Sequence, residues 1–99
     1  MAREKDFIVK HFRVDVLKES AKRAKALLAF TIYYNPSDYP GRYVARPSLA
    51  KENNVNPLQV IVLGKTYEEV VSKIPIEELG LARFAREEED DKVILETWL

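Results

Sequence analysis

Tyrosines, arginines and prolines gather in one short segment of the chain. Four of the five tyrosines lie between residues 33 and 43, around two prolines and a glycine. Aromatic rings and guanidinium groups are frequent anchors of protein interfaces, and they also stack on nucleic-acid bases. The segment therefore predicts a recognition surface on a rigid turn between two strands. Its candidate binding residues are Tyr34, Asp38, Tyr39, Arg42, Tyr43 and Arg46.

The same residues also allow a purely structural interpretation, which stays open at this point. Adjacent Tyr33 and Tyr34 must point to opposite sides of a strand, so at most one of them belongs to each face. Tyrosines pack inside proteins more often than they contact ligands. Asp38 beside Ser37 is typical of a turn-forming aspartate, and a neighbouring arginine could pair with it.

Charge is divided unevenly along the chain. Residues 1–51 hold eleven Lys and Arg against five Asp and Glu, and residues 52–99 hold five against eleven, so the halves carry +6 and −6. The sharpest basic patch, which could contact phosphates, is Lys18, Lys22, Arg23 and Lys25. A solvated helix face is the favoured interpretation, because the net charge is zero. The opposite charges either flank one core or promote self-association.

Three further patterns are weaker. The acidic run at residues 87–91 lacks the glycine and spacing of a calcium loop, so a solvated connection is favoured. His11 has no nucleophile or orienting group beside it in sequence, which favours a structural role. Gly64-Lys65-Thr66 lacks the preceding glycine of a phosphate loop, because position 59 is Gln59. The sequence thus predicts no catalytic residue, no metal and no cofactor.

These patterns predict a non-enzymatic protein-interaction module that uses the Tyr/Arg-rich turn or an exposed sheet edge. The alternative is nucleic-acid binding through the basic N-terminal half and the Tyr/Arg surface. An enzyme that uses Tyr, Asp and Arg is disfavoured, because no spacing reveals such a site. The expected partner is another protein or a second copy of the chain.

Length and composition predict one domain over residues 1–99, since the 99 residues are 46% hydrophobic. Cysteine is absent, which excludes disulfides and thiolate zinc sites. No apolar run approaches the roughly 20 residues that span a bilayer, and the N-terminus lacks a signal-peptide core. We therefore expect a soluble, cytoplasmic protein with no membrane partner.

Hydrophobic periodicity predicts the elements that must position the candidate residues. Alternation over residues 7–14 indicates a strand. Apolar residues spaced by four, three and four from residue 17 to 28 indicate an amphipathic helix that Asp15 caps and that ends near Lys25 or Ala26, with a loop as the alternative. Residues 27–34 form a strong strand pattern.

The second half predicts strands, a loop and one helix. Residues 42–47 alternate until Pro47 removes a donor, and residues 48–57 predict a polar loop. Within this loop, residues 51–57 have the Asn and Pro content of turns and are the expected mobile segment. Residues 58–63 are nearly all apolar, as in a central strand. Thr66-Tyr67-Glu68-Glu69 is a capping box for a helix that runs to about Ile74, followed by a short turn that Gly80 ends. Residues 92–98 predict a final strand, while 81–86 stay ambiguous.

Together these elements predict an α+β fold. The sheet is expected to be mostly antiparallel, with four to five strands and one or two helices packed on one face. Its strands lie near residues 27–34, 42–47, 58–63 and 92–98. Residues 26–99 then form a β-β-β-α-β core, to which residues 1–25 are an N-terminal addition.

Three segments carry a resemblance to known sequences: NPSDYPGRYVAR at residues 35–46, a helix that ends in Ile74-Pro75, and DDKVILETW at residues 90–98. Over residues 28–99 the chain resembles small bacterial and phage proteins that have no established activity. The resemblance implies a natural compact module, and it transfers no functional residue.

Overall fold

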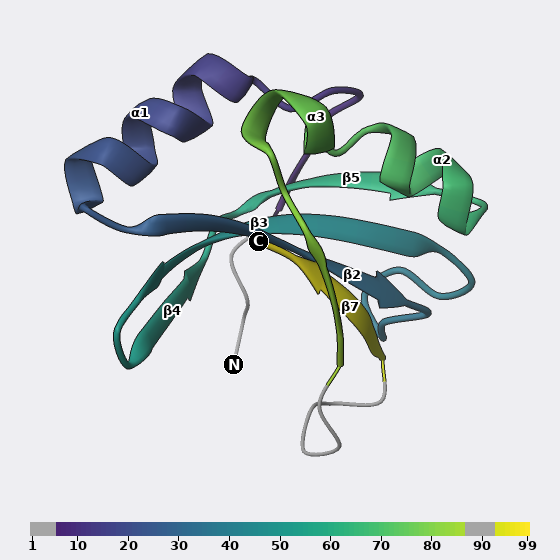
Figure 1. Ribbon diagram of the computed structural model, residues 1–99. Helices are drawn as coiled ribbons and strands as arrows, with labels where there is room; N and C mark the ends of the chain where they lie inside the picture. Colours follow the sequence, from purple (N-terminus) through teal and green to yellow (C-terminus); the bar gives the residue numbers. More distant parts are fainter. Residues whose placement is uncertain (1–5, 87–92) are drawn as a thin grey trace.

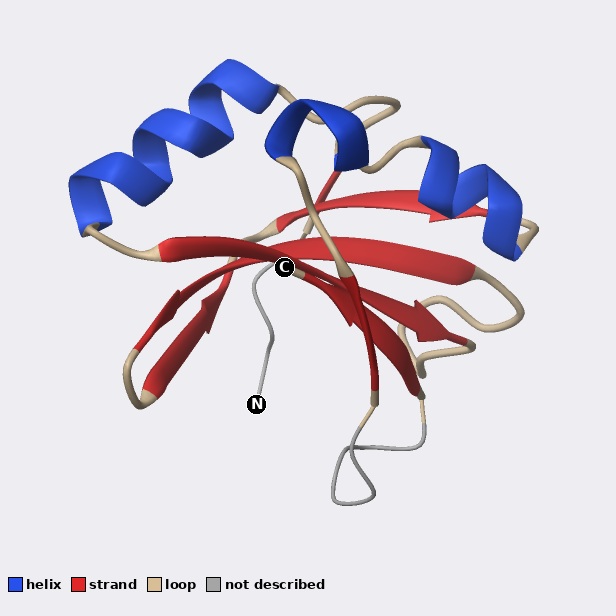
Figure 2. Ribbon diagram, in the orientation of Figure 1, coloured by secondary structure: helices blue, strands red, loops and turns tan. Residues whose placement is uncertain are grey.

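The computed structural model describes residues 6–86 and 93–99, where a seven-stranded mixed sheet carries three helices on one face (Figures 1 and 2). The predicted α+β class is confirmed. The elements in chain order are β1 (Phe7–Ile8), α1 (Val14–Ala24), β2 (Leu27–Tyr34), β3 (Tyr43–Lys51), β4 (Asn54–Pro57), β5 (Val60–Gly64), α2 (Tyr67–Ser72), α3 (Ile76–Leu79), β6 (Arg83–Ala85) and β7 (Ile94–Trp98). The strand order is β1-β5-β3-β2-β7-β6, and β4 pairs with β3.

The described sheet is larger than the predicted four to five strands, and it is not purely antiparallel. β1 pairs in parallel with β5, whereas the other strand pairs are antiparallel. Of the strand predicted over residues 7–14, only Phe7–Ile8 forms a strand, because the chain leaves the sheet edge after β1 and then enters α1 at Val14. β4 and β6 account for the remaining difference, since neither has a strand-like composition. Within the described residues the helices also number three, rather than the expected one or two.

The prediction of a loop over residues 48–57 is wrong, because most of these residues form the hairpin of β3 and β4. β3 continues through Pro47, which was expected to end the strand. The carbonyl of Pro47 accepts a hydrogen bond from the Leu58 N–H at 2.9 Å, so this residue directs its backbone polar groups away from β2. Proline has no N–H to donate, and its nitrogen lies on the same side of β3 as this carbonyl, toward the kink between β4 and β5. The strand pairing is already interrupted at this kink, so the absent donor does not break the pairing with β2. Pairing of β3 with β2 is continuous over eight residues.

Residues 14–24 form the amphipathic helix α1 rather than the alternative loop. The predicted cap is wrong, because Arg13 is the N-cap and Asp15 lies inside the first turn. The Asp15 carboxylate there accepts a hydrogen bond from Nη2 of Arg13 at 3.2 Å. A carboxylate in the first turn still interacts favourably with the helix dipole. Lys25 ends the helix in the left-handed conformation (φ 53°), close to the predicted position.

The predicted N-cap of α2 at Thr66 is confirmed, but the reciprocal bond of the capping box reaches the Lys65 amide rather than the Thr66 amide. The Glu69 N–H donates to the Thr66 hydroxyl at 3.1 Å, and the Glu69 carboxylate accepts from the Lys65 N–H at 3.1 Å. α2 ends at Ser72, slightly before the predicted Ile74, and α3 follows until Gly80 ends it at a positive φ of 61°. α2 covers β3 and β5, and α1 covers β2, on the face of the sheet that also carries α3 (Figure 1).

The core lies between the helices and one face of the sheet. Its buried side chains are Phe12, Leu17, Phe30, Ile32, Ala45, Val62, Val70 and Ile74. Because side chains alternate along a strand, the neighbours of Ile32 and Ala45 must point to the opposite face, which carries no helix. Those neighbours include Tyr33, Val44 and Arg46. The alternation thus directs one tyrosine and one arginine of the predicted recognition segment to the helix-free face.

Replacing Gly64 by Ala is expected to destabilise the fold by about 1–3 kcal/mol through overpacking. A Cβ added at Gly64 would lie 2.6 Å from Cγ2 of Val70, which is fully buried. The branched Val70 side chain has little rotamer freedom in a helix, so the strain must pass into the backbone. Chemical denaturation of the two proteins measures the difference, and an unchanged midpoint would show that α2 shifts freely.

Candidate functional site

A cleft of about 490 Å³ opens on the helix-free face of the sheet. It lies between the turn that joins β2 to β3 and the kink that joins β4 to β5. Its lining residues come from both of these connections and from the neighbouring strands: Asp6, Tyr33, Pro36, Ser37, Asp38, Tyr39, Val44, Arg46, Pro57, Gln59 and Val93. The lining combines aromatic and proline surfaces with a few polar groups, which is typical of ligand sites.

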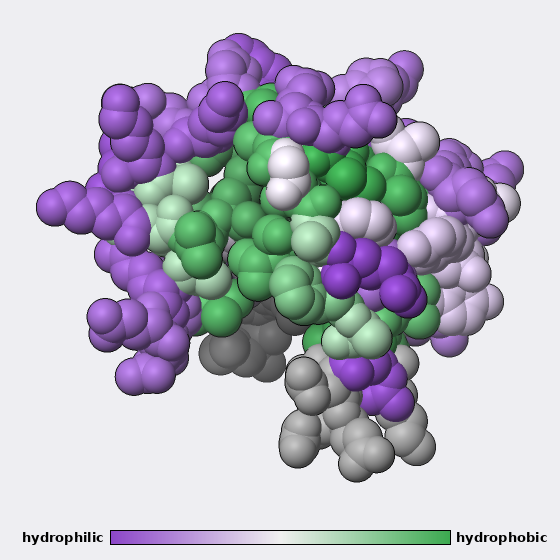
Figure 3. Space-filling model, viewed as in Figure 1, coloured by the Kyte–Doolittle hydropathy of each residue, from purple (hydrophilic) through white to green (hydrophobic). Residues whose placement is uncertain are grey.

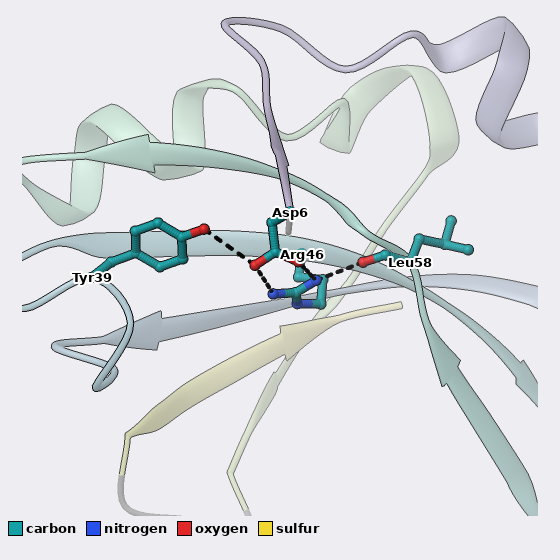
Figure 4. Close-up of polar contacts among 4 residues, drawn as sticks. All are labelled: Asp6, Tyr39, Arg46 and Leu58. Carbon is teal, nitrogen blue, oxygen red and sulfur yellow. Dashed lines mark hydrogen bonds and ion pairs between the residues drawn. The ribbon is translucent and has the colours of Figure 1, made fainter. Parts of the chain in front are cut away.

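A largely buried ion pair lines one side of the cleft (Figure 4). Arg46 donates from Nη1 and Nη2 to the two Asp6 carboxylate oxygens, at 2.9 and 2.8 Å. The side chains of Arg46 and Asp6 are only 15% and 6% exposed. Nη1 of Arg46 also donates to the Leu58 carbonyl at 2.7 Å, inside the kink between β4 and β5. Arg46 therefore joins the segment before β1 to the bend that shapes the cleft.

Tyr39 extends from the turn to this ion pair. Its hydroxyl donates to the Asp6 carboxylate at 3.2 Å (Figure 4). The turn itself is fixed locally, because the side-chain carbonyl of Asn35 accepts from the Gly41 N–H at 2.7 Å. Both residues have positive φ values, 55° and 74°, which asparagine and glycine adopt at low cost. The turn thus holds the Tyr39 ring against the cleft.

The surroundings raise the pKa values of Arg46 and Tyr39, further from neutrality. The hydrogen bonds to Asp6 raise the pKa of Arg46, although burial acts in the opposite direction. Burial raises the pKa of Tyr39, and the neighbouring charge of Asp6 and the hydrogen bond to it raise that pKa further. The cleft therefore presents a neutral phenol beside a carboxylate whose charge is paired with a guanidinium.

A second polar cluster lies on the helix-covered face, around the buried carboxylate of Glu96. It accepts from the Tyr67 hydroxyl at 2.6 Å, from the Trp98 indole N–H at 2.7 Å and from Nε of Arg83 at 2.8 Å. Burial by itself raises the pKa of Glu96, but the three hydrogen bonds outweigh it and hold the pKa below the ordinary value. This cluster ties α2 and β6 to β7, and it contributes no residue to the cleft lining.

The structure divides the six predicted binding residues into two groups. Asp38, Tyr39 and Arg46 line the cleft. Tyr34 and Tyr43 instead face the helix side, where their ring centroids lie 4.6 Å apart. The Tyr43 ring also meets Tyr67 edge to face, with centroids 6.5 Å apart. Arg42 is exposed at the end of the turn and does not belong to the cleft lining.

The predicted basic patch lies on α1, where Lys18, Lys22 and Arg23 are exposed, and Lys25 is exposed just after the helix. Arg23 donates to the Glu19 carboxylate at 3.2 Å. Because α1 covers the opposite face of the sheet, this patch and the cleft do not form one continuous surface (Figure 1). His11 is exposed, and the acidic run at residues 87–91 lies outside the described residues.

Sequence reasoning missed several residues of the cleft. Asp6 carries no local signal, because its role arises from contact with a residue 40 positions away. Gln59 and Val93 enter only because β5 and β7 lie beside β3 and β2. Tyr33 could have been assigned, since strand alternation separates it from Tyr34 and places it with Arg46 on one face.

No protein-family model matches the chain, and comparison with curated proteins and with solved structures reveals no match. Among the described residues, no helix has the length and apolar character needed to cross a membrane.

Proposed function

We propose that the protein is a non-enzymatic interaction module that binds a segment of a partner polypeptide in the cleft on the helix-free face of its sheet. The observation that carries this proposal is a cleft of about 490 Å³ whose wall, including Tyr39, is held by the buried Asp6–Arg46 pair. That volume lies within the range of roughly 300–1,000 Å³ typical of ligand pockets.

The lining suits a peptide. Tyr33 and Tyr39 offer ring surfaces, and Pro36 and Pro57 add rigid apolar contact, all with few rotatable bonds to immobilise. The side chain of Gln59 can both donate to and accept from a peptide backbone. Rigid aromatic anchors beside a small number of polar groups are characteristic of the centres of protein interfaces.

The chemistry of the cleft favours binding over proton transfer. A general acid or base needs a pKa close to the working pH. Arg46 and Tyr39 are shifted away from neutrality, because the pKa of each is raised. Asp6 accepts hydrogen bonds from both of them, so its carboxylate has a structural role: it holds Arg46 and Tyr39 in place beside the cleft.

Replacing Ser37 by Trp is expected to weaken peptide binding by about tenfold or more, because the indole would fill the cleft that Ser37 lines. Peptides selected from a random display library on the unmodified protein provide the ligands, and fluorescence anisotropy provides the dissociation constants. Ser72→Trp is the matched control, since Ser72 is an exposed serine on α2, away from the cleft, and should leave affinity unchanged.

Two outcomes would contradict the proposal. One is the failure of repeated selections to yield any peptide, and the other is equal loss of affinity in Ser37→Trp and Ser72→Trp. Oligonucleotides at low salt belong in the same assay. Oligonucleotide binding that survives Ser37→Trp but is lost in Lys18→Glu/Lys22→Glu would favour the nucleic-acid alternative.

A further inference from the structure

The charges in the cleft lining do not balance. Among the described lining residues, Asp6 and Asp38 carry carboxylates and Arg46 carries a guanidinium, so the lining has a net charge of −1. Arg46 donates to both Asp6 oxygens and to the Leu58 carbonyl, so its positive charge is compensated within the protein. Asp38, by contrast, lies exposed on the turn between β2 and β3. The cleft therefore favours a ligand that carries positive charge.

Two tyrosine rings line the same cleft, Tyr33 from β2 and Tyr39 from the turn that follows it. Cationic side chains bind favourably against the faces of aromatic rings, and arginine also stacks on them. The Tyr39 hydroxyl donates to the Asp6 carboxylate, which holds the ring in place (Figure 4). A hydrogen bond to an anion polarises the phenol and makes its ring more electron-rich. The ring is thereby better suited to contact a cation.

The exposed carboxylate lies close to these rings. Asp38 precedes Tyr39 in a turn that the Tyr39 N–H closes by donating to the Pro36 carbonyl at 3.0 Å. Burial is the main cause of the raised pKa of Tyr39, and the nearby charges of Asp6 and Asp38 raise it further. A carboxylate has about four acceptor positions, so Asp38 can accept from a ligand in addition to its contacts within the chain.

The basic side chains of α1 do not offset the charge of the cleft. Lys18, Lys22 and Arg23 are exposed on α1, whose outer surface is hydrophilic (Figure 3). This helix packs on one face of the sheet, and the cleft opens on the other (Figure 1). Exposed charges that are far apart are largely screened by salt. The field inside the cleft is therefore set mainly by its own residues.

We propose that the cleft binds an arginine or lysine side chain of the partner segment, with the cation against the rings of Tyr33 and Tyr39 and bonded to the Asp38 carboxylate. This inference rests on the proposed peptide binding, and it names the feature of the peptide that is recognised. Arginine should bind more tightly than lysine, because its planar guanidinium can stack on a ring and donate two hydrogen bonds to one carboxylate.

The peptides selected on the unmodified protein provide the test. They should share an arginine or lysine, and replacing it by citrulline or acetyl-lysine, which lack the charge, should weaken binding about tenfold. On Asp38→Asn the same replacement should change affinity by less than about twofold, because the interacting carboxylate is gone. Asparagine forms the same turns as aspartate. Glu68→Gln is the matched control, since it removes an exposed carboxylate from α2 and should keep the full effect.

Fluorescence anisotropy measures each dissociation constant, and circular dichroism confirms that each variant is folded. Selected peptides that share no basic residue would overturn the inference, as would an equal loss on the unmodified protein and on Asp38→Asn. In either case a loss of binding in Ser37→Trp would leave the proposed peptide cleft standing. Selections that yield no peptide would overturn both proposals.

Discussion

Replacing Asp6 by Ala is expected to lower the free energy of unfolding by about 3–5 kcal/mol, the range for removing one partner of a buried ion pair. The reason is that the Arg46 guanidinium, only 15% exposed, would keep its charge without the carboxylate that it contacts at 2.8 and 2.9 Å. The Leu58 carbonyl remains as an acceptor, but it carries no compensating charge. The loss should depend weakly on salt, because burial limits screening.

Urea denaturation of a double-mutant cycle measures this effect. Asp6→Ala/Arg46→Met should recover much of the stability lost in Asp6→Ala, since the double variant leaves no buried charge. Tyr39→Phe is the mild control, because it removes one hydrogen bond of 3.2 Å and should cost only about 0.5–1.5 kcal/mol. A cost below about 1 kcal/mol for Asp6→Ala would mean that the pair does not hold the cleft wall in solution.

Replacing Glu96 by Ala is expected to cost about 2–4 kcal/mol, because the Trp98 indole N–H and the Tyr67 hydroxyl would both lose their acceptor. Arg83 adds little to this loss, since its half-exposed side chain can be solvated by water. Trp98 is the single tryptophan of the chain, so its fluorescence reports on the cluster directly. Glu52→Ala, which removes an exposed carboxylate from the turn between β3 and β4, should leave both stability and emission unchanged.

The Glu96 cluster also predicts the direction of a pH effect. The folded-state pKa of Glu96 lies below its ordinary value of 4.5, so folding favours the charged form. The resulting stabilisation is complete above that ordinary value and is lost as the pH falls through the folded-state pKa. The unmodified protein should therefore lose stability in acid more steeply than Glu96→Ala. Parallel pH dependences in the two proteins would contradict a charged, hydrogen-bonded Glu96.

Local interactions explain which parts of the fold were predictable. The N-cap of α2 needs only residues three positions apart, and it forms with the expected hydrogen bond from the Glu69 amide to Thr66. The strand at Leu27–Tyr34 has a long β-branched and aromatic run, and its predicted bounds are correct. The hairpin at residues 43–57 was not predicted, because Pro47 and the asparagines have low strand propensity. Pairing with neighbouring strands, and not local propensity, determines their conformation.

The sequence by itself determined the α+β class, the main strands, both ends of α1 to within a few residues and the separation of Tyr33 from Tyr34. These features depend on periodicity and on contacts within a few residues. Only the tertiary structure decided that Asp6 would meet Arg46, that Glu96 would gather three donors, and that the predicted binding residues would divide between two faces. Strand order and the packing of distant segments set those contacts, and neither leaves a pattern among neighbouring residues in the chain.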